Sequence, residues 1–279
     1  MKVSVLLLTY NEEINIERCL ASLDWCDDIW AIDSGSTDRT LEMLKQGGVK
    51  VLHRPFDNFA NQRNFGLDEA DWKHDYVLHL DADEESTPVF REQIEDLSAS
   101  DAVDAWNVPS KTILLGQWLK HAGMYPSYQV RLGHRERLRF VQVGHGQRED
   151  LPADRVGTLN VPYNHYNFSH GMQKWLEKHV RYARDEAEEL SHAQRQDEAG
   201  LATGGRRRLK QIANKLPPAL RPAFRFIYVY FVRRGFLDGK AGLAYALMMA
   251  TYEGMIGSFV FEQPMNDTAR ISSGDTARS

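Results

Sequence analysis

The sequence YVLHLDADEES, residues 76–86, changes from an apolar run to a cluster of acids within a few residues. The run has the length and composition of a strand that is covered on both faces, as strands of parallel sheets are. Asp81 and Asp83 follow at its end, and residues i and i+2 of an extended chain point to the same side. The stretch therefore predicts a buried strand that delivers two carboxylates to one edge of a sheet.

The same pattern recurs upstream of this strand. Three strand-like segments are KVSVLLLTY (2–10), DIWAID (28–33) and VKVLHR (49–54). Segments with helical periodicity separate the strands, namely 12–23, 36–48 and 59–71. Such alternation predicts parallel βαβ units. Ligands of open parallel sheets bind beyond the carboxyl ends of the strands, so Thr9, Asp33 and Asp81 should converge on one rim.

The rest of the chain follows a different rhythm. Residues 104–166 contain short, irregular strand-like segments, which predict a mixed half of the sheet. Residues 171–198 carry apolar side chains at three- and four-residue steps and predict a long helix. We therefore expect a domain over 1–170, a helical region over 171–265 and a disordered polar tail over 266–279.

The charge of the chain is unevenly distributed. The formal net charge is -5, but residues 201–240 carry ten Lys or Arg and one acid, which is a local charge of +9. The net acidity does not suggest nucleic-acid binding. Residues 204–234 combine cations with the apolar run FIYVYFV, which suits an anionic membrane surface, although a solvated helix face would look similar. Segment 241–261 is interrupted by Glu253, and we expect it to pack on the domain or lie at the interface rather than span the membrane.

Cysteine usage and the start of the chain indicate a cytoplasmic protein. Cys19 and Cys26 make no disulfide framework, which fits a reducing compartment. The apolar stretch Val3–Leu8 is too short for a signal peptide and is followed by charged residues. Together with the cationic stretch 204–234, this predicts a peripheral location on the inner face of the cytoplasmic membrane.

The acids after the fourth strand suggest a cation site. No glycine-rich GxGxxG loop follows the first strand and no GxxxxGK[ST] motif occurs, which argues against dinucleotide and P-loop sites. Mg²⁺ usually binds through one or two carboxylates plus substrate phosphates, and Asp81 and Asp83 could supply them. The alternative is a solvated acidic turn, with Glu84 and Glu85 either supporting a site or serving as surface charge.

Three stretches together resemble glycosyltransferase family 2: LLLTYNEEINIERCLASL, IWAIDSGSTDRTLEML and YVLHLDADEE. Stretches 125–132, 179–190 and 235–253 are similar to the branch that includes bacterial lipopolysaccharide core β-glucosyltransferases. The resemblance implies an α/β fold of GT-A type, a Rossmann-like nucleotide-sugar-binding fold with a mixed sheet and a helical C-terminal region. Residues 1–85 would be its nucleotide-binding half and 104–166 its acceptor half.

The resemblance also implies roles for individual residues. The residues that would bind the nucleotide sugar are Thr9, Tyr10, Asn11, Glu12, Asp33, Arg63 and Asp81. Within that set, Asp33 would contact uracil or ribose, Arg63 the sugar or diphosphate, and Asp81 the ribose side. Asp83 would hold Mg²⁺ or Mn²⁺, with His165 nearby. The residues expected to shape the acceptor side are Trp106, Lys111, Trp118 and Arg131.

Inverting transfer, which the resemblance implies, needs a general base within hydrogen-bond reach of the acceptor hydroxyl. Glu149 best matches the glutamate of a His-Glu element in the branch, although Arg148 stands where the branch has His. Asp150 is the alternative base. Either acid could instead be a surface group paired with Arg148 or Arg155.

These features lead to one functional prediction with two alternatives. The prediction is an inverting, metal-dependent glycosyltransferase that moves a hexose such as glucose from a UDP-sugar to a lipopolysaccharide-core or other lipid-linked saccharide. One alternative is a phosphatase of haloacid-dehalogenase type that uses Asp81 and Asp83, although that arrangement expects its motif on the first strand. The other is a non-catalytic, membrane-associated scaffold with the same fold.

Overall fold

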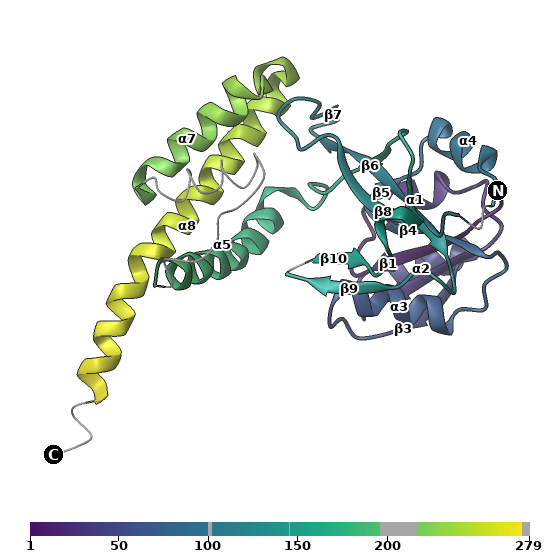
Figure 1. Ribbon diagram of the computed structural model, residues 1–279, viewed down its shortest axis with the longest axis horizontal. Helices are drawn as coiled ribbons and strands as arrows, with labels where there is room; N and C mark the ends of the chain where they lie inside the picture. The colour runs from purple at the N-terminus through teal and green to yellow at the C-terminus, as the bar shows by residue number, and fades with distance from the viewer. Residues whose placement is uncertain (100–101, 145, 196–216, 275–279) are drawn as a thin grey trace. The chain divides into compact units, whose positions relative to one another are not determined.

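The computed structural model describes residues 1–99, 102–144, 146–195 and 217–274 (Figure 1). The chain forms two compact units. The first consists of Met1–Trp118 and Met124–Ser169, and the second of Leu119–Gly123 with the chain from His170 onward. The sequence places its division between residues 170 and 171, but it gives no sign that residues 119–123 belong with the helices.

The first unit begins with a parallel half-sheet. Its strands, in spatial order, are β3 (Lys50–His53), β2 (Ile29–Asp33), β1 (Ser4–Thr9) and β4 (Tyr76–Asp81). The helices that connect them are α1 (Ile16–Ala21), α2 (Thr40–Gln46) and α3 (Phe59–Glu69). The register sets Thr9 beside Asp33 and Leu8 beside Asp81, so the strand ends share one rim. The four strands and three helices predicted from the alternation are confirmed.

Antiparallel pairing extends the sheet beyond β4. β8 (Ser127–His134) pairs antiparallel with β4 and with β6 (Ala105–Leu114), and β12 (Tyr163–His165) runs parallel to β6. The two-residue strand β5 (Glu84–Glu85) closes the order by pairing with β12. The short elements beside this path are β7 (Gln117–Trp118), η1 (Ala153–Arg155) and β11 (Val156–Thr158). This confirms the predicted mixed half. A separate hairpin is formed by β9 (Phe140–Val143) and β10 (Gly146–Glu149).

Alternation along the strands divides the core into two layers. Val5 and Leu7 of β1 pack with α1, α2 and α4 (Pro88–Asp96), whereas Leu6 packs with α3 and the β9 side. In β4, Val77 and His79 face the α3 side, where His79 is fully buried with its ring edge-on to Phe140. The same period directs Asp81 toward α3.

The second unit is helical. Its elements are α5 (Gly171–Arg195), η2 (Pro218–Leu220), α7 (Arg221–Ile227), the π-helical turn η3 (Tyr228–Val232), η4 (Gly235–Asp238) and α8 (Gly239–Gly274). Ala183 and Ala187 of α5 are buried against Ile256 of α8. Helix α7 packs along α8, where an ion pair of 2.9 Å joins Arg221 to Glu253 (Figure 1). The predicted helical C-terminal region is therefore present.

Helix α8 runs into the polar tail for which the sequence predicts disorder, residues 266–279. Helix α8 continues to Gly274, so residues 266–274 are helical, and residues 275–279 lie outside the described chain. Composition suggested disorder because the segment is polar. Once a helix is nucleated, however, each added residue gains a backbone hydrogen bond at small cost, so a long helix can extend into a polar segment.

The turn between α7 and α8 holds the segment Leu119–Gly123. The carboxylate of Asp238 accepts hydrogen bonds from the backbone N–H groups of His121 (2.8 Å) and Ala122 (2.7 Å). The guanidinium of Arg233 donates to the carbonyl oxygens of His121 and Gly123. These bonds satisfy the backbone of a buried loop and explain why it belongs to the helical unit.

Candidate active site

The carboxylate of Asp33, at the end of β2, is fully buried and bound by neighbouring donors. Its Oδ1 accepts from the backbone N–H groups of Gly35 and Ser36, both at 2.9 Å. Its Oδ2 accepts from the hydroxyls of Ser36 and Thr9, the latter at 3.1 Å. The predicted convergence of Thr9 and Asp33 is thus present. In this arrangement Asp33 shapes the loop after β2, and contact with uracil or ribose stays a prediction.

The loop after β1 is locked to the loop after β2. Asn11 has a left-handed backbone (φ 55°), donates its N–H to Ser36 Oγ and accepts from the N–H of Thr37. The N–H of Glu12 donates to Thr40 Oγ1 at 2.7 Å. The ring of Tyr10 is left exposed at this edge. The predicted nucleotide-binding loop therefore has a fixed backbone and one free aromatic face.

Asp81, at the end of β4, is held by two buried arginines. Its Oδ1 lies 2.7 Å from Nη2 of Arg63 on α3, and its Oδ2 lies 3.1 Å from Nη2 of Arg131 on β8. Burial alone would raise the pKa of Asp81, but the two guanidinium groups outweigh it and hold that pKa well below its usual range. Asp81 is therefore a charged group whose charge is already balanced.

Glu84 and Glu85 are structural members of the site rather than surface charge. Glu84 is buried, accepts from the N–H of Asp81 at 2.9 Å and forms an ion pair with Arg131. Burial raises the pKa of the Glu84 carboxyl to about 7, against the opposing effect of Arg131. Glu85 accepts from Asn164 Nδ2 at 2.8 Å and from the Tyr166 hydroxyl at 2.7 Å. Both glutamates thus fix the Asp81–Asp83 turn.

Asp83 and His165 are brought together by the pairing of β5 with β12. His165 Nε2 lies 3.3 Å from Asp83 Oδ2, and their side chains are 24% and 21% exposed. Burial would lower the pKa of His165, but the Asp83 carboxylate outweighs it and raises that pKa to about 9. Unlike Asp81, Asp83 forms no ion pair with an arginine among the described residues, so it faces only a proton-bearing imidazole.

This pair fits a divalent cation that is shared with a ligand. Within the described ranges, no group of three or more His, Cys, Asp or Glu side chains could hold a metal ion. A cation would have to displace the proton of His165, because only a neutral imidazole nitrogen can bind a metal. One carboxylate oxygen and that nitrogen would leave the other coordination positions to phosphate oxygens and water, which is how Mg²⁺ usually binds. Asp83 and His165, the two residues predicted from the sequence, could therefore hold Mg²⁺ or Mn²⁺.

Two residues assigned to the acceptor side lie elsewhere. Arg131 is buried under Asp81 and Glu84, and its Nε donates to the Tyr163 hydroxyl at 3.0 Å. Trp106 is buried in the core, with its ring 5.6 Å from that of Tyr76. Both assignments came from their place in the mixed half. The signal that could have corrected them is a charged or bulky side chain inside an apolar strand, since a buried charge needs a charged partner.

The other two members of that acceptor set contact each other. Lys111 Nζ lies 4.9 Å from the centre of the Trp118 ring, a cation–π contact at the β6–β7 pair. Their role toward an acceptor stays a prediction.

The predicted base lies on the hairpin of β9 and β10. Gln147 and Glu149 are partly buried, whereas Arg148 and Asp150 are exposed, as expected for alternating faces of a strand. Glu149 stands opposite Phe140, which packs on His79 and whose backbone makes two hydrogen bonds of 2.9 Å with the side chain of Asn64 on α3. Glu149 therefore lies on the face of the hairpin that turns toward α3, and its role as the base, with Asp150 as the alternative, stays a prediction.

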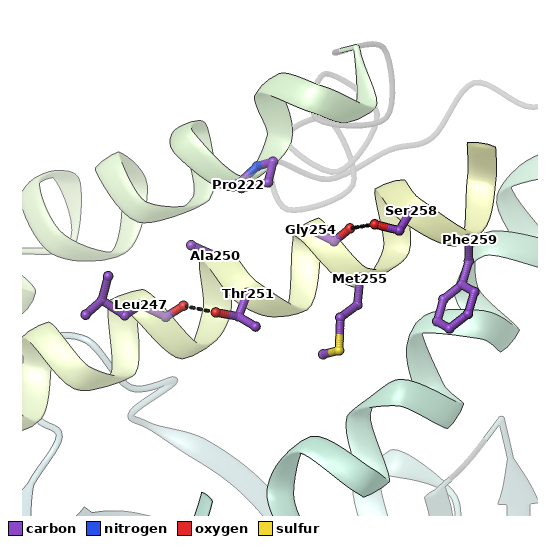
Figure 2. A pocket seen from close by; sticks show the side chains of 8 residues that line it. All are labelled: Pro222, Leu247, Ala250, Thr251, Gly254, Met255, Ser258 and Phe259. Atoms are coloured by element: carbon purple, nitrogen blue, oxygen red, sulfur yellow. Dashed lines mark hydrogen bonds between the residues drawn. The ribbon is translucent and has the colours of Figure 1, made fainter. Parts of the chain in front are cut away.

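A groove in the helical unit carries no comparable chemistry (Figure 2). It measures about 590 Å³ and is lined by Pro222, Leu247, Ala250, Thr251, Gly254, Met255, Ser258 and Phe259. The hydroxyls of Thr251 and Ser258 donate to carbonyl oxygens of their own helix, so they present no free polar group (Figure 2). The strand ends of the first unit, rather than this groove, therefore remain the candidate active site.

Comparison with known proteins decides the family of this chain. A model of the family described as glycosyl transferase family 2 matches residues 4–147, more than half of the chain. The chain belongs to glycosyl transferase family 2. The predicted resemblance and its GT-A fold class are thereby confirmed, because the matched residues cover the parallel half-sheet and most of the mixed half.

Curated relatives of this family 2 chain also carry the name of glycosyltransferases. An uncharacterized glycosyltransferase of Rickettsia bellii is 25% identical over 265 residues, covering 89% of this chain and 82% of the relative. The lipopolysaccharide core biosynthesis glycosyltransferase LpsC of Rhizobium meliloti is 29% identical over 157 residues, 54% of each chain. A structure of glucosyl-3-phosphoglycerate synthase from Mycobacterium tuberculosis with Mn²⁺, UDP and glucosyl-3-phosphoglycerate has a TM-score of 0.44 and 21% identity, covering 60% of this chain and 72% of that one.

Proposed function

We propose that this family 2 glycosyltransferase moves a hexose, such as glucose, from a UDP-sugar to a lipopolysaccharide-core or other lipid-linked saccharide, with inversion at the anomeric carbon. The observation that carries the proposal is the contrast between two aspartates on one turn. Arg63 and Arg131 neutralise Asp81, whereas Asp83 stands beside His165 without an arginine partner in the described structure. Such a turn can offer one carboxylate to a cation while the other stays fixed.

Each group would then have one task. Asp83 and His165 would hold Mg²⁺ or Mn²⁺, which supplies Lewis-acid stabilisation of a diphosphate leaving group. The loop of Thr9, Tyr10, Asn11 and Glu12, with Asp33, would enclose the nucleotide. Glu149 would accept the proton of the acceptor hydroxyl as its oxygen bonds to the anomeric carbon and UDP departs from the opposite side.

The acceptor class has support from one relative. LpsC carries the name of a lipopolysaccharide core glycosyltransferase, and it aligns with about half of this chain. A lipid-linked acceptor would require the enzyme to work at the cytoplasmic face of the membrane. We therefore retain the proposal of a cytoplasmic, peripheral enzyme.

The described part of the cationic stretch 204–234 gives little support to a peripheral membrane location. Residues 204–216 lie outside the described chain. In the described part, Arg221 pairs with Glu253, and Arg233 donates to backbone carbonyl oxygens. Separately, Gly235–Glu262 is long and apolar enough to cross a membrane, with a mean hydropathy of 1.2 over its best window. A single such span is weak evidence, because core helices of soluble proteins pass the same test.

The phosphatase alternative lacks a free nucleophile. It requires the first aspartate of the Asp-x-Asp motif to attack a phosphorus atom. Both oxygens of Asp81 are instead engaged by buried guanidinium groups. Asp81 is therefore unsuited to be the nucleophile that this alternative requires.

A donor screen with a matched pair of variants tests the proposal. UDP release is measured with each UDP-sugar against extracted lipid-linked glycans, and thermal unfolding is followed with UDP and Mn²⁺. We expect wild type and Asp75→Ala, which removes an exposed acid, to be stabilised alike by UDP with Mn²⁺. We expect Asp83→Ala to lose the Mn²⁺-dependent part. If UDP with Mn²⁺ left the unfolding temperature of wild type unchanged, the proposal would be wrong.

A further inference from the structure

The turn that joins α7 to α8 exposes an unusual amount of apolar surface. We call residues 228–240 the hairpin tip. Its exposed apolar side chains, with their exposed fractions, are Phe231 (56%), Val232 (66%), Phe236 (46%) and Leu237 (54%). Four large apolar side chains within seven residues are more than a soluble surface usually gathers, and such a patch marks a site of interaction.

The support of these side chains is tightly packed. Val229, Gly235 and Asp238 are buried at the base of the tip, and Asp238 holds the backbone of His121 and Ala122. A Cβ added at Gly242 would lie 1.9 Å from the Gly235 carbonyl oxygen, so the two segments touch backbone to backbone. The apolar side chains therefore project outward from a fixed turn, and their exposure does not come from fraying.

The exposed charges of the tip have one sign. Arg234 and Lys240 are exposed, whereas Asp238 is the single acid between residues 217 and 252 and is buried. Aromatic rings flank them: Tyr230 lies 5.1 Å from Phe231 and 6.3 Å from Phe236. Apolar side chains, tyrosines and cations without exposed acids are the combination that suits the head-group region of an anionic bilayer.

We infer that the hairpin tip inserts Phe231, Val232, Phe236 and Leu237 into the head-group region of an anionic lipid bilayer, with Arg234 and Lys240 against lipid phosphates. This inference deepens the membrane attachment of the proposed function and rests on it, but it centres the contact on residues 228–240, which overlap only the last residues of the cationic stretch 204–234. A second copy of the chain is a poorer occupant. In a two-fold contact each tip would face the same cations, and like charges across an interface are costly.

The lipid-facing surface continues along α8. Leu243 and Leu247 are exposed and follow Lys240 at steps of three and four residues, so they share one face of the helix. Leu247 also lines the apolar groove of Figure 2. The tip and this face together form one apolar strip, as expected for a hairpin that lies at an interface.

Vesicle sedimentation with the full chain tests the inference. The probes are vesicles of phosphatidylcholine with phosphatidylglycerol, and vesicles of phosphatidylcholine alone. We expect wild type to bind the anionic vesicles and the double variant F231S/F236S to bind them at least about tenfold more weakly, because the apolar surface of two exposed rings no longer enters the lipid. Arg234→Ser should weaken binding about fivefold, and only to anionic vesicles at low salt. Phe56→Ser, which alters a 53%-exposed phenylalanine of the first unit, is the matched control and should bind like wild type.

Three results would overturn the inference. The first is equal vesicle binding by F231S/F236S and wild type. The second is a wild-type dimer, detected by sedimentation equilibrium, that this double variant abolishes, which would assign the tip to a second copy. The third is protein that carbonate at high pH cannot release from membranes, which would indicate a spanning helix. F231S/F236S should bind UDP like wild type, so a result that rejects membrane insertion by the tip leaves the proposed nucleotide site unaffected. If the proposed nucleotide site is wrong, wild type will not bind UDP but will still bind anionic vesicles.

Discussion

Asp33 and Asp81 stand at the ends of β2 and β4, the two strands that flank β1 in one parallel sheet, yet their carboxylates are stabilised differently. Asp33 is bound by uncharged donors, mostly from the three residues that follow it. Asp81 is bound by two guanidinium groups, from Arg63 and from Arg131, 50 residues further along the chain. The first carboxylate fixes a loop, and the second joins β4, α3 and β8 into one charged cluster.

The difference shows how a sheet edge can serve two ends of a ligand. The hydrogen-bond donors around Asp33 are uncharged, and the exposed His53 lies 3.9 Å from its Oδ1, an environment that suits contact with hydrogen-bond donors of a base or ribose. The arginines cancel the charge of Asp81, so Asp83 can take a cation without a second bare carboxylate beside it. The two ends of the ligand site therefore differ in the charge around each aspartate, and not only in their position along the sheet edge.

The largest expected effect is at Arg131. Arg131→Met leaves Glu84 buried without its ion-pair partner and removes one of the two arginines that bind Asp81. Breaking a buried ion pair in this way costs about 3–5 kcal/mol of unfolding free energy. Urea denaturation measures it. Arg91→Met, which removes a half-exposed helical pair with Glu95, should cost less than about 0.5 kcal/mol. Equal losses in both variants would mean that the buried cluster is not special.

Asp33→Ala should have a smaller effect on stability. It leaves the N–H groups of Gly35 and Ser36 without their acceptor, at a cost of about 2–3 kcal/mol by the same denaturation assay. The loop should then lose its shape, and UDP binding by calorimetry should fall. Asp33→Asn, which keeps one acceptor oxygen, should recover part of the stability. A loss larger than that of Arg131→Met would reverse the comparison.

Glu84→Gln tests whether charge or hydrogen bonding fixes the Asp81 turn. The amide oxygen can still accept from the N–H of Asp81, while Arg131 keeps Asp81 as its partner, so we expect a loss of about 1–2 kcal/mol. Glu84→Leu removes both functions and should cost more. If the two variants were equally unstable, the hydrogen bond to Asp81 would contribute nothing.

The smallest expected effect is a difference in acid sensitivity. Burial, with help from Arg63 and Arg131, holds the pKa of His79 well below its usual value, so the folded state keeps this ring neutral. The unfolded chain binds a proton below about pH 6.5, and stability should therefore fall by up to about 1.4 kcal/mol per pH unit on acidification below that value. His79→Leu should flatten this part of the stability curve. His53→Leu, an exposed histidine at the Asp33 end, should leave it unchanged.

The sequence predicted the parts of the fold that depend on local pattern. Apolar periodicity located the four parallel strands and the helices between them. The Asp-x-Asp spacing predicted Asp83 as a metal ligand, and the structure places it beside His165. The ion pair between Arg131 and Glu84 was not predicted from the sequence. It depends on the pairing of β4 with β8, which no local sequence pattern indicates. The polarity of the tail predicts disorder, and no local pattern in the sequence indicates that α8 runs into it.

The placement of Leu119–Gly123 has a consequence for how this enzyme can be taken apart. The chain passes between its two units three times, after residues 118, 123 and 169. The family model covers this loop, but Asp238 and Arg233, which hold it, lie far beyond the matched residues. A shortened protein that ends at residue 169 would keep the loop and lose its partners, so it should be prone to proteolysis there. We expect family members that lack the helical unit to carry a different loop at this position. The loop 119–123 and the helical unit should therefore occur together.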